Sequence, residues 1–410
     1  MKKLIGPFAQ VLTMDKLPTK GALKDEQLEI ISNGALLSVD GKIDEVASFE
    51  RLRQEHPDAI QEEVESKQVV LPGLIDCHTH LCYAGSRARD YAARNNGKTY
   101  QEIAAAGGGI WDTVTKTREA SQAHLETEML NRMNTLLRRG VTTVEVKSGY
   151  GLSLEEELKL LRAIQQGGDR HPIDCIATCL AAHIIPREFT EEADYLDYII
   201  IDLVPAITSE KLASRFDIFI EENAFTPSKS TRYLQLLRQK GFQLTVHGDQ
   251  FTSGGSSVAI EVGAASVDHL EASGPAEIVA LSKSETVPVI LPGASLGLGM
   301  PYAPARKLLN AGCTLAIASD WNPGSAPNGN LLMQAALLGA SEKLSSVEIF
   351  AGLTSRAAHA LRLEDRGALK PGLLADLIAF PANDYREILY HQGEMQPSMV
   401  WKRGLRVDHF

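Results

Sequence analysis

Cysteine is scarce in this 410-residue chain, which has five of them, at positions 77, 82, 175, 179 and 313, and no Cys-x-x-Cys motif. A sparse, odd number of cysteines argues against a disulfide framework, so we expect reduced thiols that pack as small hydrophobic side chains in the cytoplasm. Long apolar stretches are also missing, since no run reaches the roughly 18 residues of a membrane span. The N-terminus lacks the apolar core of a signal peptide, and we expect no export.

Blocks of basic residues are missing too. Lys and Arg number 41 against 52 Asp and Glu, which gives a net charge of −11. A surface of this charge repels a nucleic-acid backbone and an anionic membrane, so we expect neither as a partner. A small anionic substrate stays compatible, because a single buried arginine can bind it locally. No Gly-x-Gly-x-x-Gly follows an expected strand, which argues against a dinucleotide site in an open doubly wound sheet.

What the sequence does contain is an average globular composition, 44% hydrophobic and 23% charged, arranged as alternating strand and helix patterns. Eight short apolar runs alternate with helical patterns over residues 71–362, which predicts an α/β fold, a (β/α)8 barrel of the TIM type. The expected strands lie at 69–80, 141–149, 173–185, 216–225, 242–248, 266–271, 286–292 and 314–322. Residues 1–70 and 363–410 instead show short strand-like runs and turns, including a hairpin signal at Asp40-Gly41.

Five of the eleven histidines lie at or near the ends of expected core strands, where a barrel carries its chemistry. His78 and His80 are two residues apart, so on a strand both side chains point to the same face. His247 ends a second apolar strand, and Asp320 follows a third, where a carboxylate requires a cation or several donors. These four side chains are a plausible ligand set for one divalent or trivalent metal ion, zinc or iron, with a position left open for water. Such an ion lowers the pKa of its water to about 7.

His183 and His269 complete the set of five. His269 beside the metal would transfer a proton or orient the substrate, although a buried, hydrogen-bonded histidine explains it equally well from the residues alone. Taken alone, the His78–His80 pair also fits two ordinary hydrogen-bonded side chains.

Together these motifs resemble the amidohydrolase superfamily. The matching positions are LPGLIDCHTH (71–80) for its first strand, His247 for its fifth, His269 for its sixth and Asp320 for its eighth. The resemblance implies a metal-dependent barrel over 71–362 and a small composite β-sandwich built from residues 1–70 and 363–410. Some members bridge two metals with a carboxylated lysine on the fourth strand; the matching strand here has no lysine, so a single ion is expected.

A closer resemblance is to the superfamily members that open an imidazolone ring in histidine degradation. The matching segments are 85–110 (GSRARDYAARNNGKTYQEIAAAGGGI), 113–121, 144–152 (VEVKSGYGL), 181–186, 247–250 (HGDQ), 267–271 (VDHLE) and 319–327 (SDWNPGSAP). This resemblance implies hydrolysis of the cyclic amide of 4-imidazolone-5-propanoate to N-formimino-L-glutamate, by a homodimer.

Substrate-binding positions also follow from this closer resemblance. They are Arg87, Tyr150, His183, Gln250, Asn322, Gly324 and Ser325. Arg87 is the expected counter-ion of the propionate, His183 and Gln250 are expected to contact the ring, and the loop 322–325 is expected to hold the product. Without the resemblance, Arg87 equally fits a solvated loop charge, Tyr150 a packed aromatic ring and 322–325 an ordinary turn.

The expected proton carrier is Asp320, which would take a proton from the attacking water and pass it to the leaving ring nitrogen, with His269 as a second candidate. His183 is expected to hydrogen-bond the ring or the developing oxyanion. Nucleobase deaminases of the superfamily carry a proton-shuttling Glu three residues after the fifth-strand histidine. Gln250 occupies that position and cannot shuttle a proton in that way, which counts against a deaminase.

Three charged residues near these strands have open roles. Lys147 is expected in a structural ion pair, while Glu221 and Glu222 either support the metal site or partner Lys147. Two other functions also stay open: a different cyclic amidohydrolase or aminohydrolase on the same scaffold, and a non-catalytic protein derived from it.

Overall fold

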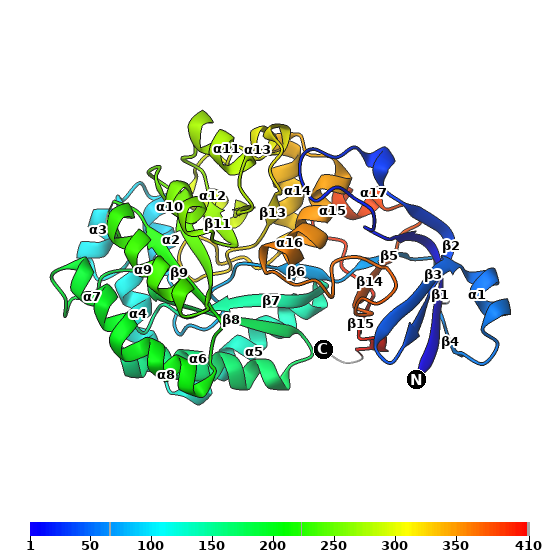
Figure 1. Ribbon diagram of the computed structural model, residues 1–410, viewed down its shortest axis with the longest axis horizontal. Helices are drawn as coiled ribbons and strands as arrows, with labels where there is room; N and C mark the ends of the chain where they lie inside the picture. Colours follow the sequence, from blue (N-terminus) through cyan, green and yellow to red (C-terminus); the bar gives the residue numbers. More distant parts are fainter. Residues whose placement is uncertain (65–66, 223, 408–410) are drawn as a thin grey trace.

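The computed structural model describes residues 1–64, 67–222 and 224–407, which form a barrel and a separate sheet (Figure 1). The barrel strands are parallel and follow the order β13-β12-β11-β10-β9-β8-β7-β6. These strands are β6 (Leu74–Asp76), β7 (Val141–Lys147), β8 (Asp174–Ala182), β9 (Arg215–Ile220), β10 (Gln243–Gly248), β11 (Ser266–His269), β12 (Val287–Ile290) and β13 (Ala316–Ile317). Each predicted core strand is found, and the TIM-like barrel is confirmed.

The barrel closes between its first and last strands, just beyond the ends of β6 and β13. Thr79 and Trp321 form a parallel bridge there, His80 N donates to Trp321 O at 2.9 Å, and Asp320 N donates to His78 O at 3.1 Å. β7 is buried along its whole length, polar residues included, as expected for a parallel strand that is covered on both faces. This junction between the first and last strands, here called the seam, places residues 78–80 beside residues 320–321, and both stretches contain expected metal ligands.

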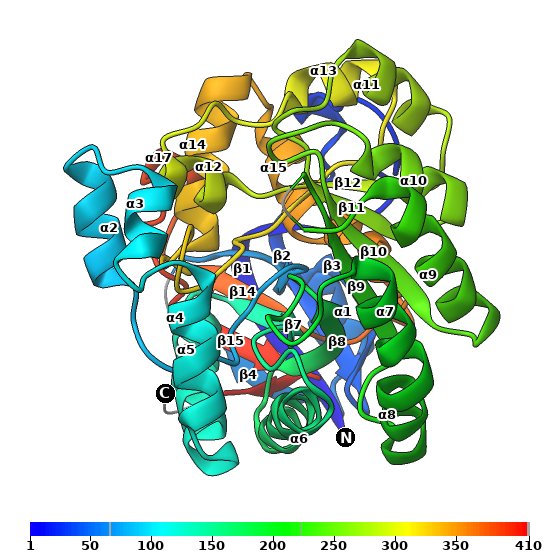
Figure 2. The same ribbon diagram turned by 90° about the vertical axis from the view of Figure 1, so that its left-hand side faces the viewer.

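Helices surround the barrel strands, as the view along the strands in Figure 2 shows. α6 is typical: three glutamates occupy its first turn, which complements the helix dipole, while Leu158, Leu161 and Ile164 are buried. The helices are α1 (Phe49–Glu55), α2 (Ala88–Asn95), α3 (Tyr100–Ala105), α4 (Ile110–Glu119), α5 (Gln122–Arg138), α6 (Leu154–Arg170), α7 (Glu192–Tyr198), α8 (Val204–Glu210), α9 (Pro227–Gln239), α10 (Gly255–Val262), α11 (Pro275–Ser282), α12 (Pro292–Leu298), α13 (Ala305–Ala311), α14 (Leu331–Glu342), α15 (Ser346–Leu353), α16 (Ser355–Ala360) and α17 (Arg386–Tyr390), with a 3-10 turn at Asp25–Gln27 and a π-helical turn at Ile199–Leu203. Within the described residues, no helix combines the length and apolar composition needed to cross a bilayer.

The second sheet joins the two ends of the chain. Its strands are β1 (Lys2–Leu12), β2 (Ile30–Val39), β3 (Lys42–Ser48), β4 (Ile60–Glu63), β5 (Val69–Pro72), β14 (Leu377–Phe380), β15 (Met399–Lys402) and β16 (Leu405–Arg406). β5 pairs with β1 on one side and β14 on the other, which confirms the composite unit. The predicted hairpin joins β2 to β3, and Asp40 and Gly41 both have positive φ there, as a tight hairpin turn requires. The boundaries at residues 70 and 362 stay a prediction.

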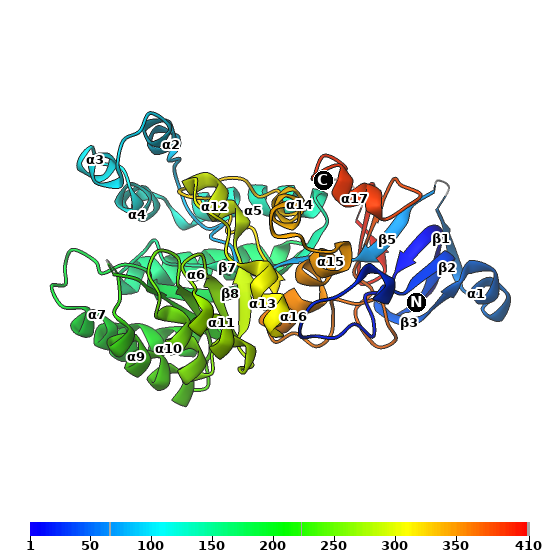
Figure 3. The same cartoon turned by 90° about the horizontal axis from the view of Figure 1, so that it is seen from above.

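The terminal sheet lies at one end of the barrel, and α2 and α3 lie at the other (Figure 3). β6 follows β5 after a single residue, so the barrel strands start beside the terminal sheet and their carboxyl ends face away from it. All five cysteines are free and four are buried, as predicted, with Cys175 partly exposed.

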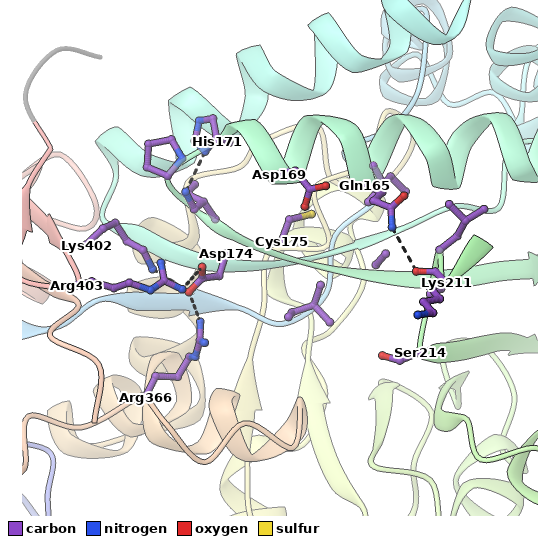
Figure 4. Close-up of a pocket in the computed structure, with 18 of the residues that line it drawn as sticks. Gln165, Asp169, His171, Asp174, Cys175, Lys211, Ser214, Arg366, Lys402 and Arg403 are labelled. Carbon is purple, nitrogen blue, oxygen red and sulfur yellow. Dashed lines mark hydrogen bonds and ion pairs between the residues drawn. The ribbon is translucent and has the colours of Figure 1, made fainter. Parts of the chain in front are cut away.

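A cavity of about 1220 Å³ lies at the start of strands β8 to β10, beside the terminal sheet. Figure 4 shows three positively charged side chains around the Asp174 carboxylate in this cavity. Their distances to Asp174 oxygens are 2.6 Å for Arg366 Nη1, 3.1 Å for Lys402 Nζ and 2.8 Å for Arg403 Nη2. Asp365 and Asp376 pair with two of the same cations, so the cluster is compensated and joins the terminal sheet to the barrel.

Removing the Asp174 charge should weaken this junction. Burial opposes ionisation of Asp174, but Lys402, Arg403 and Arg366 outweigh it and lower its pKa, so its contribution is present at neutral pH and lost as the pH falls below about 4. We expect Asp174→Asn to lower the free energy of unfolding by about 1–3 kcal/mol at pH 7 in denaturant titrations. Asp384→Asn, which removes an exposed pair with Arg386, should change it by less than about 1 kcal/mol.

Candidate metal centre

The predicted site residues gather in one pocket of about 610 Å³ at the carboxyl ends of the barrel strands. The predicted positions in its wall are His80, Arg87, Tyr150, His183, His247, Gln250, His269, Asp320, Asn322, Gly324 and Ser325. His78 is fully buried beside them, with Nε2 3.6 Å from Asp320 Oδ1. The structure therefore brings the whole predicted set together, although the roles of its members stay predictions.

Three close contacts connect the four expected ligands. His80 Nε2 lies 3.3 Å from His247 Nε2 and 3.4 Å from Asp320 Oδ1, and His78 Nε2 lies near the same carboxylate oxygen. Two overlapping groups in the described residues have ligand spacing: His78, His80 and Asp320, and His78, His247 and His269. His269 thus lies within reach of the same centre from the end of β11.

Two buried carboxylates orient the imidazoles from behind. Asp268 Oδ2 lies 2.5 Å from His78 Nδ1, and Asp217 Oδ2 lies 2.9 Å from His247 Nδ1. With both aspartates ionised, we assign the proton of each ring to Nδ1, because a carboxylate accepts and does not donate. The lone pairs on Nε2 then face the centre, and His78 Nε2 is buried without a hydrogen-bond partner among the described residues. Converging lone pairs of this kind fit a metal ion, with the oriented histidines typical of metal sites.

Two of the imidazoles, those of His78 and His247, are held neutral, as metal ligands must be. Burial is the largest cause that lowers the pKa of His247, to about 4, and it also places the pKa of His78 well below its usual range. Burial opposes ionisation of Asp320 as well, but the contacts with His80 and the neighbouring histidines outweigh it and lower the pKa of Asp320. At neutral pH the centre therefore presents two neutral donors, His78 and His247, and one anion, Asp320.

Lys147 forms a buried ion-pair network beneath the expected ligands. Its Nζ lies 2.7 Å from Glu145 Oε1 and 2.8 Å from Asp217 Oδ2, and all three side chains are almost fully buried. The expected structural ion pair is confirmed, but its partners are neither Glu221 nor Glu222. The one sequence feature that indicates this pairing is the spacing of Glu145 and Lys147 along β7, which points both side chains to the same face.

Glu221 fixes the loop that carries Gln250. Its carboxylate accepts from the backbone N–H groups of Gln250 and Phe251 at 2.9 Å and of Thr252 at 3.1 Å, and from Thr252 Oγ1 at 2.6 Å. Glu221 therefore supports the pocket wall through the backbone after β10. A carboxylate that accepts several donors in this way explains a buried glutamate at the end of β9 without a cation.

The loop after Asp320 is built around Asn322. Its Oδ1 accepts from the backbone N–H groups of Gly324 at 2.7 Å and Ser325 at 2.9 Å, and its Nδ2 donates to Asp320 O at 2.7 Å. These bonds surround Asp320, whose φ of 52° lies in the left-handed region. A non-glycine residue held there is strained, and the Asn322 bonds help to hold it in that conformation.

His183 and His269 have defined partners too. His183 Nδ1 donates to Gly149 O at 3.0 Å, and its ring stacks on His80 at a centroid distance of 5.5 Å. His269 Nδ1 lies 3.7 Å from Glu271, which accepts from Ser295 Oγ. Burial lowers the pKa of His183, whereas for His269 the Glu271 contact outweighs burial and raises its pKa. The two histidines therefore face the pocket in different protonation environments.

Gly324 leaves room for the side chain of Arg87. A methyl group on Gly324 would collide with Arg87 Nη1, while its backbone is not in the left-handed region and accepts alanine. We expect Gly324→Ala to displace the guanidinium and raise the KM for an anionic substrate about tenfold in steady-state assays. The midpoint of thermal unfolding should stay unchanged, and an unaltered KM would contradict the position assigned to Arg87.

The fold and this ligand cluster define the class of protein. Residues 96–407 match the model of the Amidohydrolase family, and the chain belongs to that family. Solved structures with the same fold include the zinc complex of atrazine chlorohydrolase TrzN from Arthrobacter aurescens (16% identity, TM-score 0.72, 98% of this chain and 94% of that chain). Guanine deaminase from Bradyrhizobium japonicum is similar at 15% identity and TM-score 0.72 over the full length of both chains.

The comparison with sequence relatives is more specific than the family match, because these relatives are imidazolonepropionases. The enzyme of Bdellovibrio bacteriovorus is 39% identical over 98% of this chain and 96% of its own. The enzyme of Symbiobacterium thermophilum is 40% identical over 99% of this chain and 97% of its own. The resemblance predicted from the sequence segments is confirmed.

Proposed function

We propose that this chain hydrolyses the cyclic amide bond of 4-imidazolone-5-propanoate and releases N-formimino-L-glutamate, the reaction that the sequence resemblance implies. Its relatives are named imidazolonepropionase, in agreement with this proposal. The observation that carries the proposal is one pocket with an inward-facing His/Asp cluster at its base and Arg87 in its wall. The cluster suits amide hydrolysis, and the arginine suits a substrate with a carboxylate.

The residues present fit one metal ion, and we infer that it is zinc or iron. His78, His80, His247 and Asp320 would hold it, since three imidazoles and one carboxylate suit either metal. When bound, such an ion lowers the pKa of water and polarises a carbonyl group.

Side chains around the cluster carry the remaining steps. Asp320 accepts the proton of the attacking water and passes it to the leaving ring nitrogen, and His269 is close enough to take part. His183 already donates from Nδ1 to Gly149, so its neutral ring presents Nε2 as an acceptor. We therefore assign His183 to a ring N–H of the substrate rather than to the oxyanion. Gln250 contacts the ring from the loop held by Glu221.

The test is turnover by the purified, metal-loaded protein. We expect 4-imidazolone-5-propanoate to be converted to N-formimino-L-glutamate, detected by mass spectrometry, with activity lost on chelation and restored by zinc or iron. Hydantoin, dihydroorotate and guanine serve as comparison substrates. Turnover of guanine in preference to the imidazolone would overturn the proposal in favour of a deaminase.

We also infer a homodimer in the cytoplasm, as the resemblance implies. Sedimentation equilibrium of the purified protein should give twice the chain mass of 44.6 kDa. A single-chain mass at micromolar concentration would contradict the dimer.

A further inference from the structure

A second arginine, Arg94, lines the same pocket as Arg87 and has no role in the proposed chemistry so far. It lies on α2, one helix that also carries Asp90, at the carboxyl end of the barrel. Arg94 Nη2 makes a long contact of 3.4 Å with Gly324 O, and Arg94 Nε is buried without a hydrogen-bond partner among the described residues. A guanidinium with unused donors in a pocket points to a ligand with acceptor oxygens.

The charge of Arg87 is already compensated. Arg87 Nε donates to Asp90 Oδ2 at 2.8 Å, and the same oxygen accepts from Gly109 N at 2.8 Å. Asp90 is buried, so its carboxylate is held close to Arg87 and is screened little by solvent. The Arg87–Asp90 pair is therefore close to neutral and does not by itself attract an anion strongly.

Arg94 supplies the positive charge that this pair lacks. No carboxylate forms an ion pair with Arg94 in the part of the chain that the structure describes. Burial and the nearby Arg87 lower the pKa of Arg94, and they outweigh the opposing charge of Asp90. The two guanidiniums meet at Gly324, where Arg94 contacts the carbonyl oxygen and Arg87 faces the Cα atom. Arg87, Asp90 and Arg94 together carry one net positive charge, which matches one carboxylate.

We propose that Arg94 binds the carboxylate of the substrate side chain together with Arg87, and that Arg94 provides the charge by which the pocket selects an acid over a neutral analogue. The inference rests on the proposed function and deepens it. Two forked guanidiniums can bind both carboxylate oxygens, while Asp90 fixes the direction of one of them. Bound substrate also relieves the repulsion between Arg87 and Arg94.

The other role for Arg94 is structural, because its contact with Gly324 ties α2 to the loop 322–325. If the role is purely structural, substitution of Arg94 changes kcat/KM for the acid and for the neutral substrate by the same factor. If Arg94 selects the charge, the substitution changes the ratio of the two kcat/KM values. The comparison of two substrates therefore separates the roles.

The experiment measures kcat and KM for 4-imidazolone-5-propanoate and for its primary amide, with wild-type protein, Arg94→Gln, Arg94→Lys and Arg89→Gln. Arg89 lies on the same helix but is exposed and outside the pocket lining, which makes it the matched control. For Arg94→Gln we expect kcat/KM for the acid to fall about 10- to 100-fold, mainly through KM, with the value for the amide nearly unchanged. Arg94→Lys should keep part of the preference for the acid, and Arg89→Gln all of it.

Each outcome decides one question. If the wild-type protein does not convert the acid, the proposed function fails and not only this inference. If it does, and Arg94→Gln keeps the wild-type ratio of acid to amide, Arg94 does not select the charge. A parallel fall for acid and amide assigns Arg94 to structure and overturns the inference. Thermal unfolding of each variant shows that the compared proteins are folded.

Discussion

Asp320→Asn is expected to lower kcat by about 10⁴-fold, the largest effect of any single change in the pocket. Asp320 is 2% exposed and contacts both His78 and His80, so the substitution removes the one anion of the cluster. It also removes the proton acceptor proposed for the attacking water. Steady-state kinetics give the loss of turnover, and elemental analysis of the same samples should show less metal per chain than in the wild-type protein.

Asp384→Asn is the control for this change, because Asp384 lies on the surface, paired with Arg386. We expect wild-type activity and metal content from it. An Asp320→Asn protein that keeps full activity, or works without metal, would be incompatible with the assigned role.

Lys147→Met is expected to lower the free energy of unfolding by about 3–5 kcal/mol. The change leaves Glu145 and Asp217 buried with no cation between them, and Asp268 lies close enough for Lys147 to influence its pKa. Burial raises the pKa of Asp268 to about 7, so this carboxyl group is already costly to ionise. Denaturant titration at pH 7 measures the loss.

The double variant Glu145→Gln/Lys147→Met should recover part of this stability, because it removes one of the two buried carboxylates that Lys147→Met leaves without a cation. Lys370→Met, at an exposed lysine 3.8 Å from Asp15, should change stability by less than about 1 kcal/mol. Equal losses from Lys147→Met and Lys370→Met would contradict a buried network beneath the ligands.

The barrel strands and the His/Asp cluster could be predicted from the sequence because both are local patterns. A buried parallel strand is a continuous apolar run, and a ligand at its end is a polar residue at a fixed place in that run. The partners behind the ligands could not be predicted in the same way. Asp217 and Asp268 look like ordinary strand residues. The pairing of β9 with β10 brings Asp217 near His247, and the curvature of the sheet into a barrel brings Asp268 of β11 to His78.

Arg94 shows the same limit at the pocket wall. It lies in a polar helix where a solvent-exposed arginine is the ordinary expectation, and nothing local distinguishes it from Arg89. What distinguishes Arg94 is its contact with Gly324, which lies near the end of the barrel sequence and is brought to Arg94 by the fold. Likewise, the alternatives for Glu221 depended on which carboxylate reaches Lys147, a matter of strand order rather than of sequence neighbours.

The seam between Thr79 and Trp321 has a consequence for folding. His78 and His80 lie on one side of this bridge and Asp320 on the other, so a chain whose last strand has not docked holds only part of the proposed ligand set. Binding of the proposed metal ion during refolding should therefore occur later than helix formation and coincide with closure of the barrel. A bound ion would in turn act as a clamp across the seam, which resists the detachment of the final strand.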